Sequence, residues 1–134
     1  MSGVAQKLSV VHAEDGGFVG DGLRTQFVYR DLGINGATDG RYHAHVIKAK
    51  TVDGLKVGLH RHDKIDFQLV YILKGWVRFW YDGSGETLAK AGTCILQPPG
   101  IAHDVLEWSD DLELLEVTSP HDFETQALGE TAAE

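Results

Sequence analysis

Residues 54–75 read GLKVGLHRHDKIDFQLVYILKG and contain two histidines, His60 and His62, separated by one residue. On a β-strand, residues two apart point to the same face, so both imidazoles can reach one point. Gln68 opens the apolar run that follows. The segment predicts two strands, over residues 55–60 and 67–73, with polar side chains gathered between them.

A second segment, residues 92–103, reads GTCILQPPGIAH and ends on another histidine, His103, 35 residues after Gln68. The Pro-Pro-Gly triplet at 98–100 marks a turn, because proline fixes φ and glycine tolerates positive φ. Two hairpin-linked strands can therefore bring His60, His62, Gln68 and His103 together inside a barrel.

The chain supplies its own comparison for this pattern. His43 and His45 have the same spacing inside a predicted strand over residues 42–50. No third ligand follows them at an obvious hairpin distance. We interpret these two histidines as structural or pocket-lining residues.

Strand signals recur along the chain, and helix signals are scarce. Further strands are predicted over residues 26–30, 77–81, 93–96, 103–108 and 112–117, separated by glycine-, proline- and aspartate-rich turns. About eight short strands with regular turns indicate an all-β sandwich or barrel. A length of 134 residues suits a single domain.

The two histidine segments resemble the two motifs of the cupin family. Gly54, His60, His62, Gln68 and Gly75 follow the order of the first motif, a glycine, an HxH pair, a carboxylate and a glycine. The second motif is matched by a glycine, a proline, a glycine and a histidine: Gly92, Pro98, Gly100 and His103. The resemblance implies a double-stranded β-helix, the jelly-roll barrel of small single-domain RmlC-like cupins.

In those terms, residues 1–134 form one cupin domain with a barrel core over about 23–120. An N-terminal arm over residues 1–22 and a loose C-terminal tail over residues 124–134 flank the core. The resemblance further implies a divalent metal in the barrel mouth, with His60, His62 and His103 as its histidine ligands and Gln68 in place of the usual glutamate.

The chain departs from the motifs in three places. The interval from His62 to Gln68 is one residue longer than usual, so Asp66, which shares strand parity with the two histidines, is a rival fourth ligand, and water is another. Glutamine replaces glutamate at Gln68. Glu107 stands where the second motif often has asparagine.

The ligand set predicts the chemistry of the site. Three imidazoles and a carboxamide are neutral, so the ion keeps its full charge and attracts an anionic or enolisable ligand. Imidazole and oxygen ligands suit Fe, Mn, Ni, Co or Zn. Gln68 cannot act as a base, which leaves Glu107, Asp66 and His45 as candidates.

These features predict a metalloenzyme that acts on a small anionic or enolisable substrate, with a dioxygenase as one form. The alternatives are a non-redox isomerase, lyase or sugar-acid-processing cupin, and a non-catalytic module that binds a small molecule. The resemblance carries the preference for an enzyme, because a fold alone does not define an activity.

Composition restricts the partners. A net charge of −8 with no basic cluster excludes binding to nucleic acid or to anionic lipid. No apolar run can span a bilayer and no signal peptide is visible, so we expect a cytoplasmic protein. The strand over residues 77–81 would be apolar on both faces, since the chain places Trp76, Val77, Phe79, Trp80 and Tyr81 within six residues. This predicts an outer face covered by the N-terminal arm or by a second subunit, and we favour a homodimer.

Overall fold

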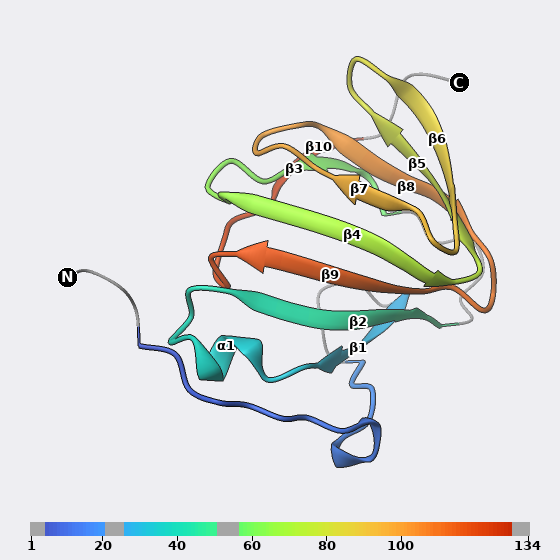
Figure 1. Cartoon of the computed structure of the whole chain (residues 1–134). Helices are drawn as coiled ribbons and strands as arrows, with labels where there is room; N and C mark the ends of the chain where they lie inside the picture. Colours follow the sequence, from blue (N-terminus) through green and yellow to red (C-terminus); the bar gives the residue numbers. More distant parts are fainter. Residues whose placement is uncertain (1–4, 21–25, 51–56, 130–134) are drawn as a thin grey trace.

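The computed structural model describes residues 5–20, 26–50 and 57–129, and within them ten strands form two facing antiparallel sheets (Figure 1). In spatial order the first sheet contains β1 (Phe27–Asp31), β2 (His43–Ala49), β9 (Glu113–Ser119), β4 (Phe67–Lys74) and β7 (Cys94–Leu96). The second contains β10 (Gln126–Gly129), β3 (Leu59–Arg61), β8 (His103–Trp108), β5 (Trp76–Tyr81) and β6 (Gly85–Lys90). Helical structure in these ranges is limited to η1 (Ala13–Asp15) and α1 (Ile34–Ala37), so the predicted all-β jelly roll is confirmed.

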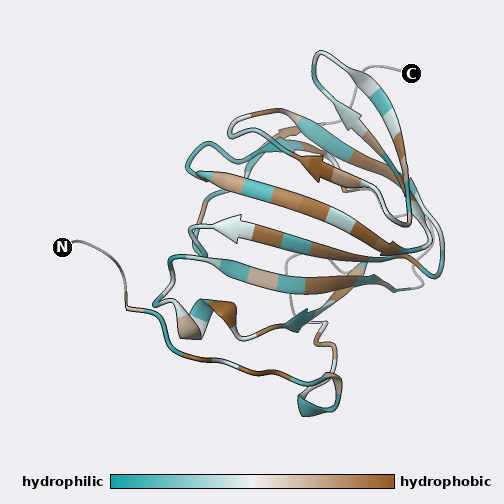
Figure 2. Cartoon of the chain, viewed as in Figure 1, coloured by the Kyte–Doolittle hydropathy of each residue, from teal (hydrophilic) through white to brown (hydrophobic). Residues whose placement is uncertain are grey.

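The core lies between the two sheets because alternate side chains of each strand point inward. On β4, Val70 and Ile72 are buried, and on β5 so are Val77 and Phe79. Figure 2 shows that β4 is hydrophobic along most of its length. This strand occupies an interior position of its sheet, between β9 and β7, and its apolar side chains form a large part of the barrel wall.

Strands that are distant in sequence are neighbours in the first sheet. Strand β9 pairs with β4 on one side and with β2 on the other. Its Glu116 lies opposite His45 of β2 and opposite Val70 of β4. This register carries residues from three separate parts of the chain to one interior level.

Gly75 shows why the first motif ends on a glycine. It turns the chain from β4 into β5 with a φ of +76°, a conformation that L side chains rarely adopt. A Cβ atom at this position would also overlap side-chain atoms of Ser109 and Asp111. The tight turn, not the chemistry of the site, requires this glycine.

The predicted strands agree with the structure over most of the chain. The predictions over residues 26–30, 42–50, 67–73, 77–81, 93–96, 103–108 and 112–117 correspond to β1, β2, β4, β5, β7, β8 and β9. Residues 51–56 lie outside the described part, so the prediction over residues 55–60 is tested only at its end, where β3 begins at Leu59. Strand β6 was not predicted, since as an edge strand it buries only Ala89.

The end of the chain differs from the prediction of a loose tail. Residues Gln126–Gly129 form β10, which pairs with β3 through Ala127 opposite His60. The pattern Gln-Ala-Leu-Gly is too short and too weakly apolar to signal a strand by itself. Pairing with an existing sheet edge provides the order that the local sequence does not.

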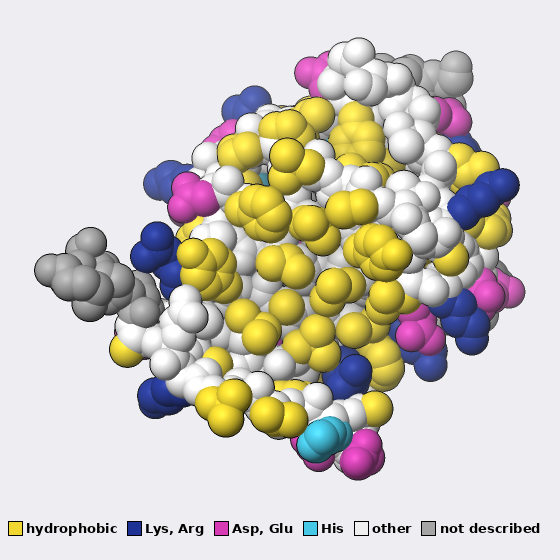
Figure 3. Space-filling model, in the orientation of Figure 1, with side chains coloured by type: hydrophobic (Ala, Val, Ile, Leu, Met, Phe, Trp, Pro, Cys, Tyr) yellow, Lys and Arg dark blue, Asp and Glu magenta, His cyan; other side chains and the backbone are white. Residues whose placement is uncertain are grey.

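Hydrophobic side chains also cover the outer face of the first sheet, as Figure 3 shows over β4, β9 and β7. The exposed members of this outer apolar patch are Phe67, Tyr71, Leu73 and Leu96, of which Leu96 is 60% exposed. The N-terminal segment runs along β1 and α1 instead, and Lys7 and Val19 make backbone hydrogen bonds there (Figure 1).

Candidate metal centre

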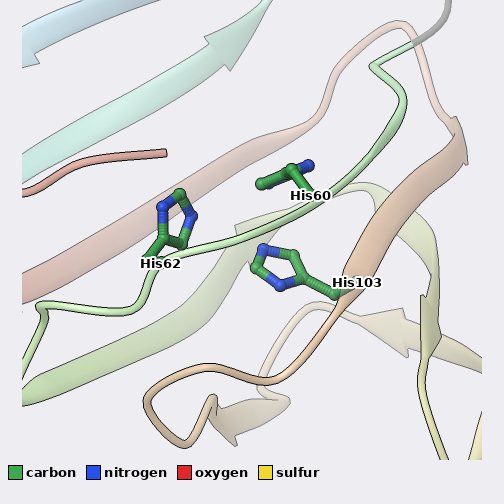
Figure 4. A group of neighbouring side chains, drawn as sticks. All are labelled: His60, His62 and His103. Atoms are coloured by element: carbon green, nitrogen blue, oxygen red, sulfur yellow. The ribbon is translucent and has the colours of Figure 1, made fainter. Parts of the chain in front are cut away.

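Three histidines from two adjacent strands converge inside the barrel (Figure 4). His60 of β3 lies directly opposite His103 of β8, and His62 follows β3 by one residue. One ring nitrogen of each lies within 4.8 Å of those of the other two, and all three residues are buried. The ring centroids of His60 and His103 are 4.2 Å apart. The expected meeting of these three side chains is therefore observed.

Backbone carbonyls fix how two of these rings are protonated. The Nδ1 atom of His60 lies 2.8 Å from the Gly58 oxygen, and that of His103 lies 3.0 Å from the Ile101 oxygen. A carbonyl only accepts, so each Nδ1 carries the hydrogen and each Nε2 carries the lone pair. This is the arrangement in which histidines bind metals.

Burial also favours the neutral form of His103. Burial, together with the neighbouring His60, lowers the pKa of His103 from 6.5 to about 4. A protonated imidazole cannot donate its Nε2 electrons, so a lowered pKa preserves the ligand form at neutral pH. Three buried imidazoles with converging ring nitrogens fit a divalent transition metal.

Gln68 of β4 lies in the same cavity and is tied to a carboxylate. Its Nε2 donates to Oε2 of Glu116 over 2.8 Å, which leaves the carbonyl Oε1 as the amide atom able to bind a cation. A glutamate at position 68 would set two carboxylates side by side. The replacement of the usual glutamate by Gln68 thus has a physical reason in Glu116.

Glu116 is the main component of the site that the sequence analysis missed. Burial by itself raises its pKa, but the hydrogen bonds from His45 and Gln68, reinforced by the electrostatic interaction with His45, outweigh burial, so its pKa lies below the ordinary value. The signal was available: Glu116 shares strand parity with the buried Leu112 and Leu114. A glutamate on the inward face of an apolar strand is a candidate functional residue.

The second histidine pair extends this hydrogen-bonded chain away from the three histidines. His45 Nε2 lies 2.7 Å from Glu116 Oε1, and His45 Nδ1 lies 3.1 Å from His43 Nε2. Since the carboxylate accepts, His45 donates from Nε2 and accepts at Nδ1 from His43. His43 Nδ1 is then unprotonated and lies 3.7 Å from the exposed carboxylate of Asp31.

The structure differs from the prediction at Glu107, a candidate base. Glu107 is exposed, and its Oε1 accepts a 3.0 Å hydrogen bond from Arg78, which also pairs with Glu86. Simple alternation would place Glu107 on the same face as His103. A β-bulge between Val105 and Glu107 reverses the alternation, so Glu107 faces outward.

Asp66, the rival ligand and second candidate base, also lies outside the cavity. It is exposed, and residues 63–64 form a turn between β3 and β4. Strand parity cannot be counted across a turn, which is why its shared parity with His60 and His62 had no structural meaning. His45, the third candidate base, does line the cavity.

The C-terminal segment completes the wall near the histidines. The hydroxyl of Thr125 lies 3.0 Å from His62 Nδ1, and the Phe123 ring meets the His62 ring edge to face at 5.0 Å. His121 and Asp122 line the same cavity. The site therefore includes residues beyond Pro120 that the motifs do not signal.

The cavity is large enough for a small organic molecule, with a volume of about 380 Å³. Its lining combines the polar groups described above with apolar side chains from both sheets. The apolar members are Phe27, Ile47, Val57, Val70, Val77, Phe79, Val105, Leu112, Leu114 and Phe123.

Comparison with known proteins now identifies the class. The model of the cupin domain matches residues 51–118, and the chain belongs to the cupin family. The expected membership of this family is confirmed. No curated protein sequence matches the chain significantly.

Solved structures with low sequence identity share the fold. KdgF from Halomonas sp. superimposes with a TM-score of 0.68 at 15% identity, over 85% of this chain and 96% of that one. The polyketide cyclase RemF from Streptomyces resistomycificus superimposes with a TM-score of 0.70 at 16% identity, over 94% of this chain and 89% of that one. At these identities the likeness establishes the fold alone.

A third neighbour is a larger enzyme. Oxalate decarboxylase from Bacillus subtilis, described with Mn(II) centres, gives a TM-score of 0.57 at 17% identity. The match covers 76% of this chain and 27% of that one, so this chain corresponds to about a quarter of the larger enzyme. In the described part of the chain, no helix has the length and apolar character that a membrane crossing needs.

Proposed function

We propose that this cupin is a metal-dependent enzyme that moves a proton on a small enolisable carbonyl compound, as an isomerase, lyase or cyclase does. The observation that carries the proposal is the pairing of Glu116 with His45 next to the three-histidine cluster. A binding module has no need of a largely buried carboxylate–imidazole pair beside a cation site.

The proposed ligands are His60, His62 and His103 through Nε2 and Gln68 through Oε1. A divalent metal bound there would act as a Lewis acid that polarises the substrate carbonyl and stabilises negative charge on its oxygen. The hydrogen bonds at the Nδ1 atoms of the three histidines hold the rings in place for such an ion.

Proton transfer is assigned to Glu116, with His45 as its partner. Glu116 lines the cavity, and a carboxylate there can take a proton from the carbon next to a carbonyl. The hydrogen bond from His45 Nε2 stabilises the carboxylate, and His45 can act as the proton donor where Glu116 does not. His43 accepts or provides the next proton of the chain, at the end nearest Asp31.

The test is hydrogen–deuterium exchange at carbon, followed by proton NMR. Protein loaded with zinc should accelerate exchange of the carbon-bound protons of 2-hydroxyacetophenone in D₂O, and Glu116→Gln should slow the exchange about a hundredfold. The zinc content of the variant should match that of the wild type.

Two other outcomes would contradict the proposal. Oxygen consumption by the iron-loaded protein with an enol or catechol, without exchange by the zinc form, would support the dioxygenase alternative. Tight binding of carbonyl compounds without any turnover, whatever the metal, would support the non-catalytic alternative. Elemental analysis of protein purified without added metal identifies the ion among Fe, Mn, Ni, Co and Zn.

We also propose that two copies associate through the outer apolar patch on β4 and β7. The patch residues Phe67, Tyr71, Leu73 and Leu96 are uncharged, so two chains can approach there despite their net charge. Light scattering should give the mass of a dimer, and Tyr71→Lys should give a monomer. A wild-type monomer at 100 μM would exclude the homodimer.

A further inference from the structure

The cavity is organised in layers, because inward residues alternate along each strand. On β2, β8 and β9, the inward residue at the polar end of the cavity is His45, His103 or Glu116, and the next inward residue is apolar: Ile47, Val105 or Leu114. On β4, Gln68 is followed by Val70, which the pairing register places level with Glu116. One such step along a strand is about 7 Å, so a polar layer lies directly beside an apolar one.

The pairing register shows that these layers cross both sheets. Ile47 lies opposite Leu114 in the first sheet, and Val105 lies opposite Phe79 in the second. Val77 and Leu112 add a further apolar level. The apolar levels therefore offer few hydrogen-bonding groups. Apart from the polar residues described above for the metal centre, the described lining contains two polar residues, Tyr29 and Gln97.

The charges of the cavity are equally restrictive. Among the described residues that line it there is no lysine or arginine, and there are two carboxylates, Glu116 and Asp122. Arg78 of β5 lies on the surface, where it pairs with Glu86 and Glu107. The side chain of Asp122 is fully exposed, so Glu116 is the carboxylate that acts inside the cavity. A divalent ion beside Glu116 would leave one positive charge, which a single enolate head neutralises, and none for a second anionic group.

We infer that the substrate is a largely apolar, aromatic or aliphatic carbonyl compound with one enolisable head, and that dianions and polyhydroxylated acids are excluded. This inference rests on the proposed function, since the head lies in the polar layer beside the metal ligands and the tail fills the apolar layer. The sugar-acid reading loses support, because each buried hydroxyl would need a partner that the apolar layer does not provide.

The experiment compares two probes that share a 1,3-diketone head with two polar acids. Isothermal titration calorimetry with the zinc-loaded protein would measure acetylacetone, 1-phenylbutane-1,3-dione, oxalate and galacturonate. The phenyl-bearing diketone should bind at least about tenfold more tightly than acetylacetone, because its ring removes additional apolar surface from water. Oxalate and galacturonate should bind more weakly than either diketone.

Variants locate the tail. Val105→Phe, and independently Ile47→Phe on the other sheet, fill the apolar layer and should remove the tenfold advantage of the phenyl group while acetylacetone affinity and zinc content stay unchanged. Val10→Phe, at a residue that is 64% exposed, is the matched control and should bind like the wild type. Circular dichroism identifies a variant that fails to fold. If Val105→Phe or Ile47→Phe does not fold, the other of the two tests the position of the tail.

The result that overturns the inference differs from the one that overturns the proposed function. Equal affinity for the two diketones, or tighter binding of oxalate or galacturonate, in protein that holds zinc would exclude the apolar substrate class alone. Failure to take up zinc would exclude the metal centre instead. In that case, binding of 2-naphthol to metal-free protein still tests the apolar cavity. We expect 2-naphthol to bind to the wild type and not to Val105→Phe.

Discussion

The two HxH pairs of this chain have the same spacing and different surroundings. His60 and His62 meet His103 in a buried cluster, with Nδ1 hydrogen bonds to a backbone carbonyl for His60 and to a threonine hydroxyl for His62. His43 and His45 hydrogen-bond to each other, and His45 continues to the carboxylate of Glu116. The first pair has lone pairs directed to a common point, whereas the second uses its nitrogens for a hydrogen-bonded chain.

The spacing of two histidines does not by itself make them a pair of metal ligands. Both pairs obey the two-residue period of a strand, so both present their imidazoles to one face. The difference lies in the neighbouring strands, since β8 brings His103 to one pair and β9 brings Glu116 to the other. His103 adds a third imidazole to the first pair, and the three rings can bind a cation. Glu116 instead accepts a hydrogen bond from His45, so that ring nitrogen is not available to a metal.

The largest expected effect separates the two pairs by metal content. His60→Ala should lower zinc affinity by at least about a hundredfold, more than the loss of a merely supporting residue, and should abolish exchange activity. His43→Ala should retain one equivalent of zinc. Elemental analysis after dialysis measures the zinc content of both variants. Equal zinc contents would contradict the assignment of His60, and not His43, as a metal ligand.

The next effect concerns the carboxylate that joins the two regions. Glu116→Gln should reduce kcat by about a hundredfold or more with little change in zinc affinity, because it removes the proton acceptor and keeps the shape. Glu113→Gln on the same strand is the control, since Glu113 does not line the cavity. An active Glu116→Gln variant would exclude Glu116 as the base.

A smaller effect is expected at the C-terminal segment. Thr125→Val removes the hydroxyl partner of His62 Nδ1 while it keeps the side-chain volume. Zinc affinity should fall about tenfold to a hundredfold, as for other residues that orient metal ligands. Competition with a chelator measures the change, and Thr87→Val, on the edge strand β6, should leave affinity unaltered.

His43 of the second pair should also affect how the free energy of unfolding depends on pH. Burial, and then His45 and His121, lower the pKa of His43, while Asp31 and Glu116 oppose the shift. The unfolded chain then binds more protons than the folded one below pH 6.5, so the free energy of unfolding falls as the pH decreases from 6.5. His43 contributes at most about 1.4 kcal/mol per pH unit. Urea unfolding of wild type and His43→Leu between pH 7 and 5 should show a smaller slope in the variant, and equal slopes would contradict the assignment.

The smallest effects are expected at the two outward acids. Glu107→Gln and Asp66→Asn should change zinc affinity and activity less than twofold, and stability by about 0.5 kcal/mol or less. Both side chains are exposed. A tenfold loss of zinc in Asp66→Asn would return Asp66 to the ligand set.

Sequence reasoning was most successful where a local period governs the structure. The two-residue period and the motif spacings predicted the convergence of His60, His62 and His103, and the turn residues located most of the strands. Where alternation is interrupted, the same reasoning fails. A bulge moved Glu107 outward, and a turn separated Asp66 from the strand parity of His62.

Other parts of the site depend on contacts that no local pattern encodes. Glu116 gains its role from strand β9 lying between β2 and β4, three segments far apart in sequence. Thr125 gains its role because β10 pairs with β3. Long-range pairing of this kind is determined by the complete sheet and not by the propensities of the paired segments.

X-ray absorption spectroscopy of the zinc-loaded protein tests the metal centre most directly. We expect one equivalent of zinc, with three imidazole nitrogens at about 2.0–2.1 Å and oxygen in the remaining positions. In His43→Ala the spectrum should be unchanged, and in His103→Ala the imidazole number should fall by one or the zinc should be lost. Absence of stoichiometric zinc, or a wild-type spectrum with fewer than three imidazoles that does not change in His103→Ala, would contradict this expectation.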